Sequence, residues 1–145
     1  MTASADLDTH CSTSDFSAVT SEILAPISLG ELVDKITILQ IKSRQLAGAA
    51  LENVKRELSV LERVLAGLEL AVDPSLMQQL EAINANLWAI EDAIRDHERR
   101  RLFDDAFVQL ARSVYRNNDE RAAIKRQIND IYGSALVEEK SYQVY

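Results

Sequence analysis

A run of apolar residues between positions 51 and 72 limits the fold more than any other feature of the chain. Its members alternate three and four residues apart: Leu51, Val54, Leu58, Leu61, Leu65, Leu68 and Val72. This spacing places them all along one seam of an α-helix, a pattern typical of a helix that packs lengthwise against another helix. The run therefore predicts a helix over about residues 50–72 and at least one partner helix.

Apolar residues also recur at helical spacing in three other stretches, which predict helices at about residues 28–47, 74–101 and 104–132. Ser28 with Glu31 predicts a reciprocal capping box at the first of these helices. Asp73 before Pro74 suits a helix start, and Gly133 suits a helix end. The short connections make sequence neighbours antiparallel. The predicted fold class is all-α, a four-helix up-down-up-down antiparallel bundle.

The two ends of the chain differ in composition from the predicted helices. Residues 1–26 are rich in Ser and Thr and poor in large apolar side chains, so we expect a disordered acidic tail. A length of 145 residues suits one domain, which we place at residues 27–145. Its last segment, residues 133–145, contains several apolar side chains, and we expect it to lie back on the bundle.

Charge and cysteine content exclude several classes of function. The net charge of -7 argues against a general nucleic-acid binder, which needs a basic surface. Four of the acids lie in residues 1–27, where there is no Lys or Arg, so the rest of the chain is closer to balance. A single cysteine, the lack of a secretory signal and the lack of a long apolar run predict a cytoplasmic protein that does not insert into membranes.

The stretch VYRNNDERAAIKRQI, residues 114–128, places polar residues where the apolar stripe of the last helix should continue. At about 100° per residue, Asn118, Arg121 and Lys125 project within roughly 40° of Val114 and so face the core. Three interpretations are open. The cations can snorkel out at the bundle edge, form a buried polar layer that sets helix register, or bind an anionic small molecule. The residues of the ligand-binding hypothesis are Glu91, Arg112, Tyr115, Asn118, Arg121 and Lys125.

A second apolar face appears on two of the predicted helices. Ile38 and Ile41 lie opposite the main stripe of the first helix, and Trp88 projects away from the Ile83–Ile90 line of the third. A monomeric bundle would leave these side chains in water, so they predict a subunit interface with Trp88 as its anchor. The alternative is that the segment after Gly133 covers them.

Motif searches give no catalytic signature. The chain has no HExxH, no glycine-rich phosphate loop, no GxSxG and no Glu-x-x-His pair, and we expect neither a metal nor a cofactor. The leading interpretation is a non-enzymatic helical interaction or accessory module that self-associates or binds another protein. The alternative is an anionic-ligand binding protein or a cofactor-independent enzyme with a polar site in the bundle core.

Four stretches resemble a known family: ISLGELVDKITILQIKSRQL (27–46), NANLWAIEDAIR (84–95), LARSVYRNNDERAAIKRQIN (110–129) and GSALVEEKSY (133–142). Together they are similar to DUF6165, a family of small uncharacterised bacterial proteins. The resemblance covers residues 27 to 142. It implies no activity, substrate or catalytic residue. It does imply that the polar part of the last helix and the EEKSY end belong to the family pattern.

Overall fold

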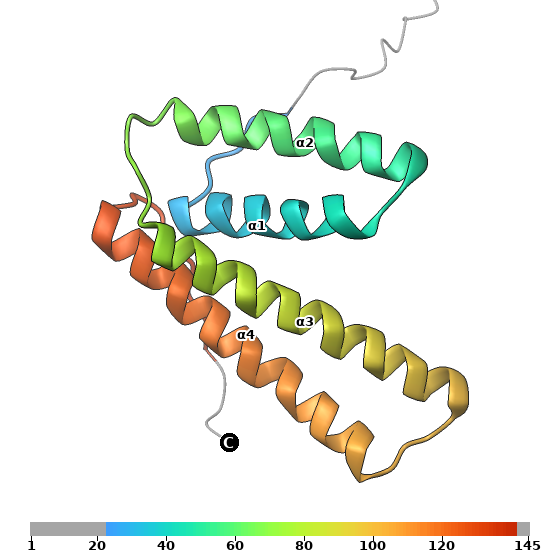
Figure 1. Cartoon of the computed structure of the whole chain (residues 1–145). Helices are drawn as coiled ribbons and strands as arrows, with labels where there is room; N and C mark the ends of the chain where they lie inside the picture. The colour runs from blue at the N-terminus through green and yellow to red at the C-terminus, as the bar shows by residue number, and fades with distance from the viewer. Residues whose placement is uncertain (1–22, 142–145) are drawn as a thin grey trace, which may run out of the picture.

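A computed structural model describes residues 23–141 of the chain (Figure 1). This range contains four α-helices and no strand: α1 (Leu29–Gln45), α2 (Gly48–Ala66), α3 (Pro74–Arg100) and α4 (Asp105–Tyr132). The all-α four-helix fold class is therefore confirmed. Of the predicted disordered tail, residues 1–22 lie outside the described residues, and residues 23–26 are exposed and belong to no helix. Residues 142–145 also lie outside the described range.

The helices form two antiparallel hairpins, α1 with α2 and α3 with α4 (Figure 1). Helix α1 is central, because its backbone runs close to those of α2, α3 and α4. The backbone of α2, in contrast, comes close only to that of α1 among the helices. Within the described residues, no helix is apolar over enough of its length to cross a membrane.

The core lies where the two hairpins meet. Its buried members come from the apolar stripes of three helices and from the link before α3: Leu29, Leu32, Val33, Ile36, Val72, Leu76, Leu80 and Ile128. Leucines of the α2 seam pack against this cluster at partial burial. Burying one apolar side chain of this size contributes roughly 1.5–3 kcal/mol, so the cluster is the main source of stability.

The start of α1 is tied to the end of α4. The first three backbone N–H groups of a helix have no partner within the helix, and here side chains accept all three. Ser28 Oγ accepts from Glu31 N at 3.1 Å, as the capping box predicts. Asn129 Oδ1 accepts from Gly30 N at 2.7 Å, and Ser134 Oγ accepts from Leu29 N at 3.2 Å. The last two acceptors belong to α4 and the segment after it, so the two ends fix each other.

Gly30 allows this close approach of α1 and α4. A Cβ at position 30 would lie 2.5 Å from the backbone oxygen of Lys125 and 3.0 Å from Asn129 Oδ1. Real Cβ atoms do not come that close to a backbone oxygen, so any larger residue would push the two helices apart.

The predicted helix boundaries hold except at the end of α2. That helix ends at Ala66 rather than near residue 72, with Gly67 as its C-cap. The chain uses residues 67–73 to pass from α2 to α3, whose start at Asp73 and Pro74 is as predicted. Leu68 is consequently 47% exposed, whereas Val72 reaches the core from the link instead of from a helix.

No further helix covers the outer half of the α3–α4 hairpin, which is the half near the connection between the two helices. In Figure 1 the hairpins spread apart toward the connection between α3 and α4. Between Leu87 and Lys125, a described stretch throughout, no residue is fully buried. Of its apolar side chains, Ile90, Ile94 and Leu110 are half-buried, and Leu102, Phe103 and Val108 are exposed.

Candidate functional site

The polar break of α4 is packed against the neighbouring elements. Lys125 is only 7% exposed, and Asn118 and Arg121 are half-buried. The prediction that this part of α4 turns away from solvent is confirmed. Snorkelling does not describe Lys125, because only 7% of the residue is exposed and its ammonium group is paired with carboxylates instead of bulk water.

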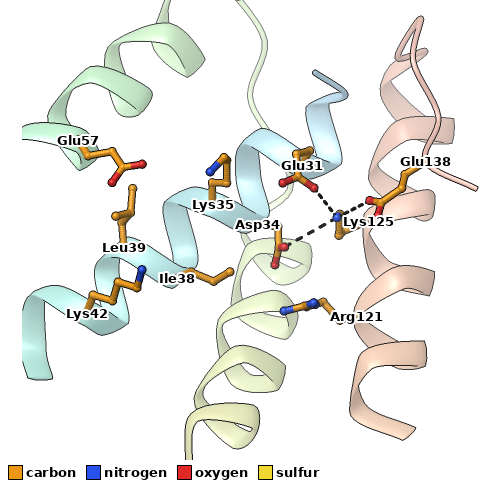
Figure 2. Close-up of a pocket in the computed structure, with 10 residues that line it drawn as sticks. All are labelled: Glu31, Asp34, Lys35, Ile38, Leu39, Lys42, Glu57, Arg121, Lys125 and Glu138. Carbon is orange, nitrogen blue, oxygen red and sulfur yellow. Dashed lines mark hydrogen bonds and ion pairs between the residues drawn. The ribbon is translucent and has the colours of Figure 1, made fainter. Parts of the chain in front are cut away.

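The Lys125 ammonium group lies between carboxylates from two different elements (Figure 2). It donates to Glu31 Oε2 of α1 at 2.5 Å and to Glu138 Oε2 of the segment after α4 at 2.5 Å. Asp34 Oδ2 of α1 is 3.9 Å away. The Glu31 carboxylate, predicted to close the capping box, is used for this ion pair instead, because a buried ammonium group needs a charged partner.

A hydrogen-bond network continues from Asp34 to α3. The side-chain amide of Asn84 donates to Asp34 Oδ1 at 2.7 Å and to Thr37 Oγ1 at 3.0 Å. Arg121 Nη1 donates to Asn84 Oδ1 at 3.4 Å. Asp34, Thr37 and Asn84 are each at most 4% exposed. We call Glu31, Asp34, Thr37, Asn84, Arg121, Lys125 and Glu138 the Lys125 cluster.

Two pKa values in this cluster are displaced from their ordinary positions. Burial, the largest influence on Lys125, lowers its pKa, but the hydrogen bonds to Glu138 and Glu31 more than offset it, so the pKa lies above 10.5. The hydrogen bond from Lys125 lowers the pKa of Glu138 below its usual 4.5. Both shifts favour the charged forms, so the ion pair persists across neutral pH.

The structure gathers only part of the residue set proposed for a ligand site. Arg112 and Tyr115 are exposed on α4, and Asn118 donates to the Val114 carbonyl oxygen of its own helix at 3.0 Å. Glu91 is exposed and pairs with Arg95 at 3.4 Å. Arg121 and Lys125 alone of the set join the Lys125 cluster.

The acids that meet Lys125 were absent from the sequence hypothesis. Glu31 looks like an ordinary capping residue, and Glu138 lies beyond the last helix, 13 positions after Lys125. Asp34 and Asn84 gave no clear signal either, because Asp34 lies on the second face of α1 with Ile38 and Ile41, and Asn84 lies beside an apolar stripe of α3 that has no gap. Polar side chains from three helices can satisfy one another when they lie at the same level of a bundle.

A groove of about 400 Å³ borders the cluster between α1, α2, α4 and the C-terminal segment, and we call it the polar groove. Its walls carry four acids and four bases: Glu31, Asp34, Glu57, Glu138, Lys35, Lys42, Arg121 and Lys125. Figure 2 shows these side chains around the groove, with Ile38 and Leu39 along α1. The lining is formally neutral, so it does not attract anions by overall charge.

A second groove, of about 240 Å³, lies between α1 and α3, and we call it the Trp88 groove. Ile38 and Trp88, two of the three predicted interface residues, line it together with Arg121. Ile41 does not take part, because it is only 4% exposed. The expectation that a monomer would leave Ile41 in water is wrong: α1 has helices on more than one side, so its second face is covered as well.

A third surface comes from residues that the sequence gives no reason to connect. Ile23, Leu24 and Ile27 precede α1, and Val64 and Leu68 lie near the end of α2; all five are at least 43% exposed. Ile27, Val64 and Leu68 line an apolar groove of about 370 Å³ that reaches Tyr132 of α4. We call this groove the apolar end.

The chemistry available in the Lys125 cluster is binding and positioning. Among the described residues, every enclosed side-chain nitrogen and oxygen has a hydrogen-bond partner. Within residues 23–141, no three His, Cys, Asp or Glu side chains gather as metal ligands would. The contacts thus favour the register-layer interpretation of the polar break, because they join α1, α3, α4 and the C-terminal segment in one arrangement.

Comparison with known proteins finds a family to which the chain is similar. The model of a family of unknown function, DUF6165, matches residues 23–145. No curated protein and no solved structure matches the chain. The match includes every element that builds the Lys125 cluster and the three surfaces.

Proposed function

We propose, from the premise that the chain belongs to the DUF6165 family of unknown function, that it is a helical interaction module that self-associates. The contact surface in this proposal is the Trp88 groove together with the adjoining outer half of the α3–α4 hairpin. The partner is a second copy of the chain.

The proposal rests on one observation, which is that no further helix covers the outer half of the α3–α4 hairpin. No residue between Leu87 and Lys125 is fully buried, although apolar side chains recur along both helices there. In a two-helix hairpin, each helix covers only one face of the other. A buried core between helices needs further helices packed around the pair. An identical hairpin from a second copy, related by a two-fold axis, would supply two more helices and complete a four-helix arrangement.

The charges around the Trp88 groove support a second copy as the partner. The groove carries two acids, Glu91 and Asp92, and two cations, Arg95 and Arg121. In a two-fold interface each residue of one copy meets a different residue of the other, so a patch with both signs can pair with itself. This balance matters because the whole chain has a net charge of -7, which would otherwise oppose self-association.

The test is the molar mass of the full chain in solution, measured by light scattering after size exclusion. The monomer mass is 16.2 kDa, and we expect twice that value for the wild type. Trp88→Ala should weaken the dimer by at least about 2 kcal/mol, roughly 30-fold in Kd, because central aromatic side chains dominate interface energies. Circular dichroism checks that the variant keeps its helices.

Leu68→Ala, at the apolar end, is the matched control. It also removes a partly exposed apolar side chain, but far from the Trp88 groove, and should leave the dimer intact. If Leu68→Ala gives the monomer and Trp88→Ala does not, the chain self-associates through the apolar end and the proposed surface is wrong. A wild type that remains monomeric at high concentration rules out the function itself.

A further inference from the structure

The two carboxylates bound to Lys125 are held in different ways. Glu31 belongs to α1 and is fixed by the packing of that helix. Glu138 belongs to a segment outside any helix, residues 135–141 of which are exposed, and its own side chain is 49% exposed. Ser134, at the start of this segment, is tied to Leu29 of α1, whereas the later residues reach the bundle through exposed side chains: Glu139 pairs with Arg126 at 2.7 Å, and Lys140 Nζ lies 3.5 Å from the Asn118 carbonyl oxygen. Glu138 is therefore the exchangeable partner.

The polar groove gives an outside molecule access to the same ammonium group. Arg121 and Lys125 line the groove from α4, and Ile38 and Leu39 line it from α1 (Figure 2). Arg121 also lies close enough to Glu138 to lower the pKa of that carboxyl. A carboxylate in the place of Glu138 would thus meet two cations, and an apolar group attached to it would lie along Ile38.

The local charge decides which anions fit. With Glu138 in place, the lining of the polar groove is formally neutral, with four acids against four bases. A monocarboxylate that replaces Glu138 keeps the groove neutral. A phosphate dianion would leave one uncompensated negative charge in a partly buried place, which is unfavourable.

We propose that Lys125 and Arg121 form a binding site for a small monocarboxylate, that Glu138 occupies this site in the unliganded chain, and that ligand binding releases the segment from Ala135 to Ser141. The C-terminal segment acts as an internal competitor. An outside ligand can bind only while Glu138 is out of the site, so its apparent affinity is its intrinsic affinity multiplied by the fraction of time that the site is free. Removal of this internal competitor restores the intrinsic affinity.

The experiment uses the full chain, with acetate and 3-phenylpropionate as probes and chloride at equal ionic strength as the reference. In the wild type, both carboxylates should speed amide hydrogen exchange in residues 135–141 beyond the effect of chloride. In Glu138→Gln this exchange should be fast without any ligand. The variant should also bind 3-phenylpropionate roughly tenfold more tightly than the wild type, because the competitor is gone.

Glu139→Gln is the matched control, since Glu139 is the adjacent acid and pairs with exposed Arg126 instead of Lys125. It should bind 3-phenylpropionate as the wild type does. Arg121→Gln in the Glu138→Gln background should weaken binding, because the second cation is lost. The effects should persist in Trp88→Ala, so the result is independent of self-association.

Two results would overturn the proposal. One is that carboxylates change amide hydrogen exchange in residues 135–141 no more than chloride does. The other is that Glu138→Gln binds 3-phenylpropionate no more tightly than Glu139→Gln. Tighter binding of phosphate than of either carboxylate would show that the ligand class is wrong.

Discussion

Lys125 and Arg126 are neighbours in sequence whose ion pairs have very different environments. The Lys125 side chain is 9% exposed and lies among three carboxylates, whereas Arg126 and Glu139 are 47% and 75% exposed. Exposed ion pairs contribute little because water screens them, but a buried carboxylate that loses its cation remains costly. The stabilising role therefore belongs to Lys125 alone of the two.

Truncation of each cation to methionine tests this difference. Lys125→Met should lower the free energy of unfolding by about 3 kcal/mol, because it leaves buried Asp34 and partly buried Glu31 without their cation. Arg126→Met should cost less than about 0.5 kcal/mol. Urea denaturation of both variants measures the two values, and equal losses would contradict the assignment of Lys125 as a buried structural cation.

The pH dependence of stability depends on Glu138 and its partner. The pKa of Glu138 is lowered from 4.5 by Lys125, so its stabilising effect is complete above pH 4.5 and is lost as pH falls through the folded-state pKa. The pKa of Lys125 is raised from 10.5, so its effect is present below that pH and is lost as pH rises through the higher folded-state value. Glu31, Asp34 and Arg121 are the other charged groups of the site. The free energy that the Lys125–Glu138 pair contributes to folding should not change with pH between the pKa of Glu138 and that of Lys125.

Urea midpoints of the wild type and Glu138→Gln should differ at neutral pH and converge on the acid side of pH 4.5. The difference at neutral pH should be under about 1 kcal/mol, because the Glu138 side chain is half exposed and screened. A difference that stays constant from neutral to acid pH would show that the ion pair is not its source.

At the scale of the elements, the contact between α1 and α4 depends on a residue without a side chain. Gly30→Ala would place a methyl group 2.5 Å from the Lys125 carbonyl oxygen and should cost about 1–3 kcal/mol, because neither helix backbone can move without disturbing the core. The N–H of residue 30 would also lose its hydrogen bond to Asn129 if the helices separated.

Gly67→Ala is the matched control for this substitution. Its nearest atoms to an added Cβ are at 3.5 Å and 3.6 Å, and its φ of -71° suits any residue. The change should leave stability the same or raise it by about 0.5 kcal/mol, through the lower entropy of the unfolded chain. Thermal unfolding of the two variants compares them, and equal effects would contradict the close approach of α1 and α4.

At the scale of the whole molecule, the two hairpins pack together at one end. At the other end the α3–α4 hairpin extends without a covering helix. All fully buried residues of α3 lie in the range Leu76–Leu87, and those of α4 lie in the range Lys125–Asn129. The proposed dimer and the proposed carboxylate site use different regions. The dimer uses Trp88 and the outer half of the α3–α4 hairpin, and the carboxylate site uses the place of Glu138 in the C-terminal segment. Arg121 borders both grooves, so it is the residue through which the two could influence each other.

Local sequence patterns predict the four helices, the caps at Ser28, Asp73 and Gly133 and the inward turn of the polar break, because these depend on the 3.6-residue period and on contacts within a few residues. Which acids meet Lys125 depends on the tertiary structure, because Glu31 and Glu138 are 94 and 13 residues from it and come close only after the hairpins pack. The end of α2 at Ala66, the burial of Ile41 and the gathering of Ile27, Val64 and Tyr132 around one groove depend on it as well. A periodic pattern shows which face of a helix is apolar, but the neighbours of that face depend on how every other helix packs.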